Sequence, residues 1–363
     1  MVKPGRRKRV NQRRPRDEPR SWADLPDHIL DSFCNRLNLE GSIRFGAVCK
    51  SWHGSSKYCN AFREHSPWMV ITSRDDHRFK CLDDHKKRWK IRRDIDKLGE
   101  IISASHGWLV SYNPDDDENQ PDITLSNPFH NEPNVALPPE QNIWWVTLSA
   151  PPTTPGGFTA VARVWSSPRI LFSHSGDGGW TDLNLVINGR FIPLESISMF
   201  KGEFHALGDS GNLYRMDLHN NNLNFVAPAA ELKPPEGVRK ARKYLVETGD
   251  NELLAVVQWK KPEETDKVAR EFEVHRLDLP SMKWVKVESL GDQVIYVSRY
   301  TAVTARVNRE GGVAREGNRI YFTKWKSKHG WFVFNMNDGS IEAGPRLGMA
   351  FYAHRYWIKP GSI

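Results

Sequence analysis

The chain has 363 residues, of which 39% are hydrophobic and 11% aromatic, so it can form two or more domains with apolar cores. No apolar run approaches the roughly 18 residues of a membrane span, and the basic N-terminus lacks the apolar stretch of a secretory signal. The net charge is +8, but nine Lys/Arg and two acidic residues at positions 3–20 supply +7 of it. The nearly neutral remainder argues against a nucleic-acid partner for the folded part, and we predict no membrane partner.

Residues 1–20 form a basic tail with almost no apolar residues, so we expect it to be disordered. Six of its basic residues resemble a nuclear-import signal: Arg6, Arg7, Lys8, Arg9, Arg13 and Arg14. The alternative is a solubilising or weakly RNA-binding arm. The tail therefore predicts a location in the nucleus, the cytoplasm, or both.

Residues 21–60 contain two short helical patterns. Pro26 opens the first, because a proline is tolerated in the first turn, where its missing N–H would lack a partner anyway. Gly46 is expected to weaken the second by ~1 kcal/mol relative to Ala. The apolar residues that define the patterns are Leu25, Pro26, Ile29, Leu30, Phe33, Leu37, Val48, Cys49 and Trp52. A unit of roughly 40 residues rarely supplies a sufficient core, so it must pack on its own chain or on a partner chain.

The LPxxIL opening at residues 25–30 and the VCKxW ending at residues 48–52 together resemble an F-box. F-boxes dock substrate receptors onto the Skp adaptor of a cullin–RING ubiquitin ligase. The resemblance implies that the nine apolar residues above bind this adaptor, without any catalytic residue in the chain. The alternative is an ordinary helical pair that packs on the following domain.

Residues 66–359 alternate short β-rich runs with Gly, Pro, Asn and Asp, which is typical of strands joined by hairpin turns. The hairpin at residues 200–217 is echoed at 317–337 and, more briefly, at 106–110. These repeats predict a large all-β domain after the small all-α F-box, namely a β-propeller of about six blades. Two β-sandwiches are the alternative. The last strand-like run, at residues 351–358, is expected to return to residues 68–73 and close the ring.

Several sequence segments indicate a particular family of proteins, among them SHGWLV, LSNPF, FKGEFHALGDSGNLYRMD and KYLVETGDNELLAVV. They resemble a plant family that joins an N-terminal F-box to a C-terminal propeller-like domain long described as of unknown function. The resemblance spans about residues 22–345. It implies a kelch-like propeller and ligase-adaptor work, but it does not supply a target.

Little in the sequence indicates catalysis or metal binding. The four cysteines lie in the first quarter without a C-x-x-C pair, and the histidines form no H-x-x-x-H pair. We therefore predict no structural disulfide, no metal, no cofactor and no enzymatic activity. The run at 324–329 mixes Lys with Trp, which favours a cationic or peptide-binding loop over a nucleic-acid platform. Trp144 and Trp145 are either an exposed anchor or residues buried between blades, and burial is favoured.

These observations favour a substrate receptor whose F-box binds the Skp adaptor and whose propeller binds a protein target. A propeller-type enzyme or small-ligand sensor would need convergent titratable residues in the central channel, and the sequence shows no such set. A third reading is an adaptor-bound regulator without a ubiquitination target.

Overall fold

The chain consists of two compact units, Met1–Cys59 and Asn60–Ile363. The computed structural model describes residues 22–34, 36–37, 39–56, 67–73, 76–80, 99–113, 121–129, 132–165, 167–228, 232, 240–260, 270–299, 301–307, 316–324, 327–346 and 354–359. The predicted tail at residues 1–20, with its candidate import signal, lies outside these ranges.

The first unit contains a short 3-10 turn and three helices: η1 (Trp22–Asp24), α1 (Asp27–Cys34), α2 (Leu39–Gly46) and α3 (Lys50–Ser56). The carbonyl of Pro26 starts α1 by accepting the N–H groups of Ile29 and Leu30 at 2.9 and 3.2 Å. The second predicted pattern is two helices, because α2 ends at Gly46. A Cβ at Gly46 would lie 2.5 Å from Ser56 Oγ, so glycine permits the close approach of α2 and α3.

The core of this unit includes Leu30, Cys34 and Phe45, all buried. The rings of Phe45 and Trp52 stack with centroids 4.5 Å apart, and Trp52 Nε1 donates to the carbonyl of Trp22 at 3.0 Å. The prediction of no disulfide is wrong at Cys34, which is disulfide-bonded, whereas Cys49 is free. Sequence spacing misled here because it does not reveal which cysteines are neighbours in space.

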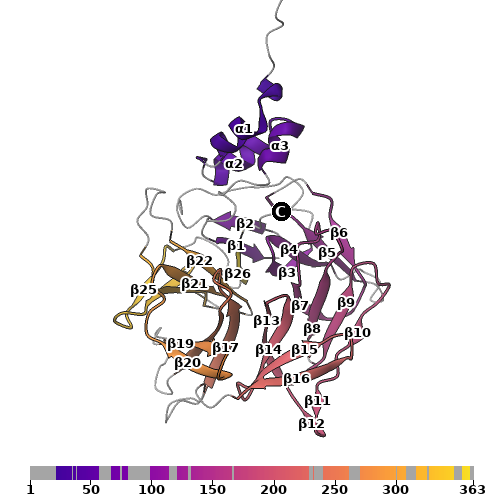
Figure 1. Cartoon of the computed structure of the whole chain (residues 1–363), viewed down its shortest axis with the longest axis vertical. Coiled ribbons are helices and arrows are strands. Elements are labelled where there is room, and N and C mark those ends of the chain that lie inside the picture. Colours follow the sequence, from indigo (N-terminus) through magenta and orange to yellow (C-terminus); the bar gives the residue numbers. More distant parts are fainter. Residues whose placement is uncertain are drawn as a thin grey trace, which may run out of the picture. The chain divides into compact units, whose positions relative to one another are not determined.

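The second unit is all-β, and its strands are arranged as successive, mostly antiparallel sheets around a common centre (Figure 1). Three four-stranded sheets are β3–β6 (Glu100–Ser105, Trp108–Asn113, Asp122–Ser126, Val135–Leu137), β7–β10 (Ile143–Leu148, Thr159–Val164, Ile170–His174, Thr181–Asp182) and β13–β16 (Leu194–Phe200, Glu203–Gly208, Leu213–Asp217, Asn222–Ala227). A two-stranded ribbon, β11–β12 (Val186–Ile187, Arg190–Phe191), lies between the last two in sequence.

The remaining strands complete the unit. They are β17–β20 (Lys240–Glu247, Leu253–Lys260, Arg270–Asp278, Lys283–Val287), β21–β25 (Gln293–Val297, Ala302–Arg306, Arg319–Phe322, Phe332–Asn335, Ile341–Ala343) and the sheet of β1 (Trp68–Ser73), β2 (Asp76–Lys80) and β26 (His354–Ile358). In the five-stranded sheet, β22 is an edge strand paired with β21, and β21 also pairs with β23 in parallel.

The described residues form five blades of four or five strands, so the prediction of about six blades is corrected to five. The three-stranded sheet β2–β1–β26 joins the two ends of the domain, as predicted for the last strand. The predicted number of blades was too high because it divided the length of the whole domain by a typical blade length. Part of that length belongs to the three-stranded sheet and to long connections between strands. Contacts of β26 with β3 and with β22 close the ring, which excludes two separate sandwiches.

Buried serines connect inner strands of adjacent blades. β3 shifts register between Ile101 and Ser103, and β13 does so between Leu194 and Ser196. Ser103 Oγ donates to the carbonyl of Val146 on β7 at 2.8 Å, and Ser196 Oγ accepts the N–H of Leu245 on β17 at 2.9 Å. These bulges therefore direct polar side chains sideways into the next blade.

Candidate functional site

The helical unit presents apolar side chains to solvent. Phe33 is 53% exposed on α1 and Val48 is 58% exposed in the turn after α2. Ile29 lies one helical turn before Phe33 and is half-buried, whereas Leu30 and Cys34 occupy the adjacent, buried side of α1. The exposed ring of Phe33, with the half-buried Ile29 one turn before it, gives α1 an apolar spot among polar exposed residues, and such a spot suits a second contact.

The nine predicted adaptor-binding residues fall into three groups by exposure. Pro26, Phe33 and Val48 are exposed, Leu25, Ile29, Leu37, Cys49 and Trp52 are half-buried, and Leu30 is fully buried. Leu30 can therefore act only by supporting the helix from within. Sequence reasoning missed Trp22, which is 75% exposed. Its signal was a large aromatic residue just before the helical pattern.

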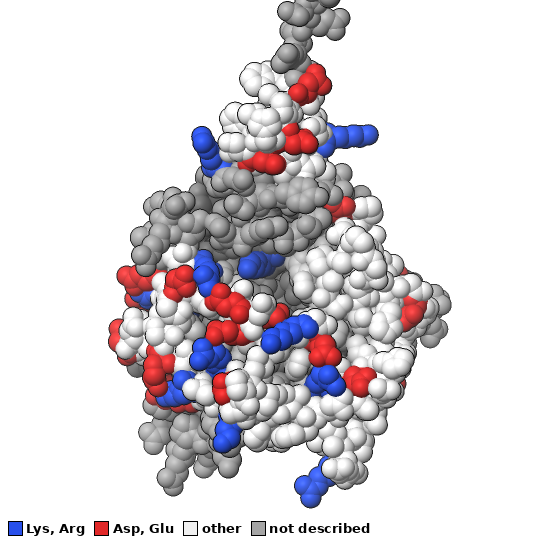
Figure 2. Space-filling model, in the orientation of Figure 1, with Lys and Arg blue, Asp and Glu red and all other residues white. Residues whose placement is uncertain are grey.

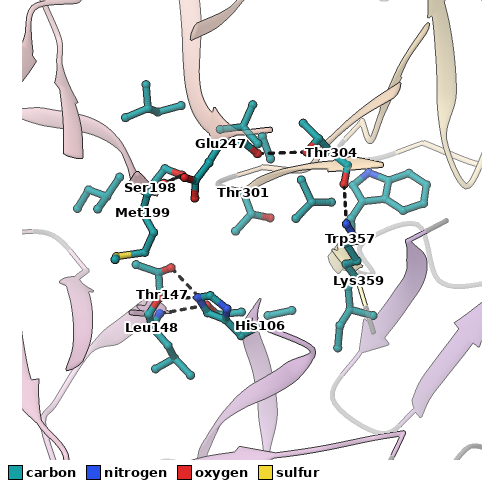
Figure 3. A pocket seen from close by; sticks show the side chains of 18 of the residues that line it. His106, Thr147, Leu148, Ser198, Met199, Glu247, Thr301, Thr304, Trp357 and Lys359 are labelled. Carbon is teal, nitrogen blue, oxygen red and sulfur yellow. Dashed lines mark hydrogen bonds between the residues drawn. The ribbon is translucent and has the colours of Figure 1, made fainter. Parts of the chain in front are cut away.

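The central channel of the propeller contains a cavity of about 430 Å³. Its lining comes from β3, β7, β13, β17, β22 and β26 and is rich in hydroxyl groups, including those of Ser105, Thr147, Ser198, Thr301 and Thr304. Figure 3 shows Thr147, Ser198, Thr301 and Thr304 around a common space. A polar, largely uncharged lining suits water or a small polar ligand.

Three titratable side chains also line this cavity: His106, Glu247 and Lys359. Their positions in the chain are so far apart that their convergence could not be predicted from the sequence. His106 lies in the turn between β3 and β4, where His106 and Gly107 have φ of 48° and 79°. Two consecutive positive φ values are typical of the tight hairpin turn that the SHGWLV phrase predicts. Burial lowers the pKa of His106, and its hydrogen bond to the Leu148 carbonyl partly opposes this.

Each of the three polar groups binds the main chain of another element. His106 Nε2 lies 3.0 Å from the carbonyl of Leu148, and Lys359 Nζ donates to the carbonyl of Thr304 at 3.4 Å. A carboxylate oxygen of Glu247 accepts the N–H of Lys201 at 3.1 Å. Burial lowers the pKa of Lys359. This arrangement joins blades around the channel, and it does not set a nucleophile beside a base.

The two tryptophans singled out in the sequence differ in environment. Trp145 is 2% exposed, which agrees with the predicted burial of this pair, whereas Trp144 is half-buried. In the Lys/Trp run, Lys324 is half-buried and Lys328 exposed, while residues 325 and 326 lie outside the described ranges. Among the described residues, no group of three His, Cys, Asp or Glu is placed to hold a metal ion. No helix in the described ranges is long and apolar enough to span a membrane.

Comparison with known proteins gives the family. The sequence profile described as KIB1-4 beta-propeller matches residues 78–335, well over half of the chain. The chain is 23% identical to F-box protein At3g56470 of Arabidopsis thaliana over 312 residues, which cover 82% of this chain and 78% of that protein. It is also 23% identical to F-box/kelch-repeat protein At1g57790 of the same plant over 362 residues, covering 93% and 94%. The chain therefore belongs to the plant F-box proteins that carry a KIB1-4 β-propeller.

Proposed function

We propose that this protein is the substrate-recognition subunit of a Skp–cullin–F-box ubiquitin ligase. The observation that carries the proposal is the exposed ring of Phe33 on α1, one turn after the half-buried Ile29, in a chain of the F-box family. The helical unit binds the Skp adaptor through this surface, and the propeller binds a protein target. The chain itself performs no chemistry; it raises the effective concentration of target lysines near the ligase.

Co-purification with a Skp adaptor tests the proposal. Replacing both Leu25 and Pro26 by Ala should weaken adaptor binding at least ~30-fold, because losing an interface anchor typically costs over ~2 kcal/mol. Phe33→Ala should act in the same direction. Ser32→Ala is the matched control, since Ser32 is exposed on the same helix but is not apolar. Unchanged co-purification of the double variant, with the control also unchanged, would refute the adaptor-binding role.

The channel cavity supports a second candidate, a small-ligand sensor, because it brings His106, Glu247 and Lys359 into one polar space. Adaptor pulldown separates a receptor from a free-standing sensor. Ubiquitination of a captured target separates a degradative receptor from an adaptor-bound regulator. Targets retained by the Leu25/Pro26 variant and found by proximity labelling would supply the substrate for that assay.

We also propose that the basic tail directs import into the nucleus, so that the receptor acts there as well as in the cytoplasm. Replacing Arg6, Arg7, Lys8 and Arg9 by Ala should shift a large fluorescent fusion out of the nucleus without changing adaptor binding. An equally nuclear fusion would contradict the import role.

A further inference from the structure

A second cavity, of about 570 Å³, opens at the other end of the inner strands. Glu100 and His354, the first residues of β3 and β26, line it, whereas Ser105 and Ile358, the last residues of the same strands, line the channel cavity. The six residues of β3 span roughly 17 Å, from Glu100 in the second cavity to Ser105 in the first. We call this second cavity the basic mouth, defined by Glu100, Arg242, Arg299, Lys324, His354 and Arg355.

The described lining of the basic mouth carries four Lys/Arg side chains and one carboxylate, that of Glu100. Arg355 is 6% exposed and is fixed at the back, where it donates to the carbonyls of Ser327 at 2.8 Å and Lys324 at 3.5 Å. Burial lowers the pKa of Arg355, so its charge is held in an environment that disfavours it. A concave site lined by one sign of charge focuses its field and attracts a ligand of the opposite sign.

Glu100 and His354 lie beside each other in the lining of the basic mouth, with Oε1 and Nε2 3.7 Å apart. Burial is the largest cause that lowers the pKa of His354. The negative charge of Glu100 opposes this shift, whereas the positive charges of Arg299 and Arg355 add to it. Arg299 and Arg355 therefore lie close enough to act on the same group. Folding brings these positive charges together in the mouth, because the residues that carry them are far apart in the sequence.

One wall of the cavity is aromatic. Trp165 is 56% exposed, and its ring meets that of Trp144 edge to face with centroids 6.1 Å apart. The guanidinium of Arg163 lies 5.9 Å from the centre of the Trp144 ring, which holds that ring in place. Exposed tryptophan beside arginine is the composition that dominates protein-binding hot spots.

The size and charge of the mouth decide between kinds of ligand. A cavity of this volume accepts a short run of side chains but not a folded domain. On the face that Figure 2 shows, Lys and Arg are interspersed with Asp and Glu, which is unlike the continuous basic stripe of a nucleic-acid-binding surface. Guanidinium groups pair bidentately with carboxylates. The Glu100 carboxylate inside the mouth penalises a doubly charged phosphate more than a carboxylate.

We propose that the basic mouth binds an acidic peptide segment of the protein target, with Arg and Lys contacting its carboxylates and Trp144 and Trp165 contacting its apolar side chains. This inference rests on the proposed function and adds the chemistry of the target to it. The receptor therefore recognises a short segment of its target that is both acidic and apolar, and not a folded surface.

Fluorescence anisotropy of the purified full chain tests the inference with a labelled peptide of alternating Glu and Leu. The double variant Arg242→Glu/Arg299→Glu should bind it about tenfold more weakly, as expected for the loss of two charge contacts, one at the exposed Arg242 and one at the half-buried Arg299. Trp165→Ala should weaken binding as well. The control is Arg190→Glu, because Arg190 is an exposed arginine that does not line the mouth. Raising the salt concentration should weaken binding to the wild type more than to the double variant.

Competing ligands and a fold check complete the design. A Lys/Leu peptide should not bind, and a phosphorylated peptide or an RNA oligonucleotide should bind more weakly than the Glu/Leu peptide. Equal binding of the Glu/Leu peptide by wild type and double variant, or tighter binding of RNA or phosphopeptide at the mouth, would overturn the inference. The melting temperature of each variant, and of the milder Arg242→Gln/Arg299→Gln, shows that the fold is retained. Adaptor co-purification of the same variants keeps the two proposals apart, since it should not change.

Discussion

Asn318 connects three segments of the β21–β25 sheet. Its Oδ1 accepts the N–H of Leu290 at 2.7 Å, its Nδ2 donates to Asn337 Oδ1 at 2.6 Å, and its main-chain N–H donates to the carbonyl of Gln293 at 2.9 Å. The residue is 6% exposed and has φ of 58°, a conformation that asparagine tolerates better than most residues. One side chain thus fixes the turns at one end of a blade.

Asn318→Ala should lower the free energy of unfolding by about 2–4 kcal/mol. It leaves the buried N–H of Leu290 unpaired, and alanine tolerates the positive φ of this position less well than asparagine. Urea denaturation measures the change. Asn251→Ala is the matched control, since Asn251 has φ of 56° but is exposed, and it should cost only about 1 kcal/mol. Similar losses in both variants would show that backbone conformation, and not the buried hydrogen bonds, gives Asn318 its role.

Strand β26 closes the propeller by pairing with β1 in antiparallel register, from Trp68 opposite Ile358 to Thr72 opposite His354. Trp357 adds side-chain contacts to the neighbouring blade: its Nε1 donates to the carbonyl of Val297 at 3.1 Å, and its ring lies 5.2 Å from that of Tyr296. Without β26, one edge of β1 would be left unpaired.

A chain that ends at Gly348 should keep adaptor binding, lose target binding and aggregate, because an unpaired strand edge invites association. Size-exclusion chromatography and the melting temperature report on this directly. Ending the chain at Lys359 is the control, since it retains β26 and should behave like the full chain. A monomeric Gly348 truncation with an unchanged melting temperature would show that β26 is dispensable for the ring.

At the level of elements, the sequence predicted the hairpins and the closing strand but not every pairing. The closing strand was predictable because an aromatic, strand-like run follows the last hairpin pattern. The parallel pairing of β21 with β23 was not, because a period of two indicates a strand but not its neighbour. The division of the second helical pattern into α2 and α3 depends on the contact of Gly46 with Ser56, which no periodicity encodes.

For the whole propeller, three histidines make stability depend on pH. Burial is the largest cause that lowers the pKa of His106, His205 and His354 below the ordinary 6.5. Below that value the unfolded chain therefore binds more protons than the folded one, so stability rises with pH through this window and is lost as the pH falls. Burial raises the pKa of Glu195, which acts in the opposite direction in a more acidic range.

The melting temperature, measured by differential scanning calorimetry, should therefore be lower at pH 5.5 than at pH 7.5. Each kcal/mol of unfolding free energy that is lost should lower it by roughly 2–4 °C. The triple variant His106→Gln/His205→Gln/His354→Gln should show a flatter profile over the same range. An equally steep profile in the variant would assign the pH dependence to other groups.

At the same scale, the all-β class and the propeller were predictable from repeated hairpins, whereas the cavities were not. His106, Glu247 and Lys359 converge from distant parts of the sequence, and so do Arg242, Arg299 and Arg355. Only the closed ring brings each set together. The nine apolar positions predicted for adaptor binding lie within a short stretch, but their division into exposed, half-buried and buried residues required the packing of the three helices.

Closure by β26 also sets an order of events during synthesis on the ribosome. The helical unit emerges first, whereas β1 must wait for β26, which follows every other described strand in the chain. The nascent chain can therefore fold its helical unit before either cavity of the propeller exists. Until translation passes residue 358, the growing blades expose an open edge, and a chaperone that shields this edge would govern how many receptors mature.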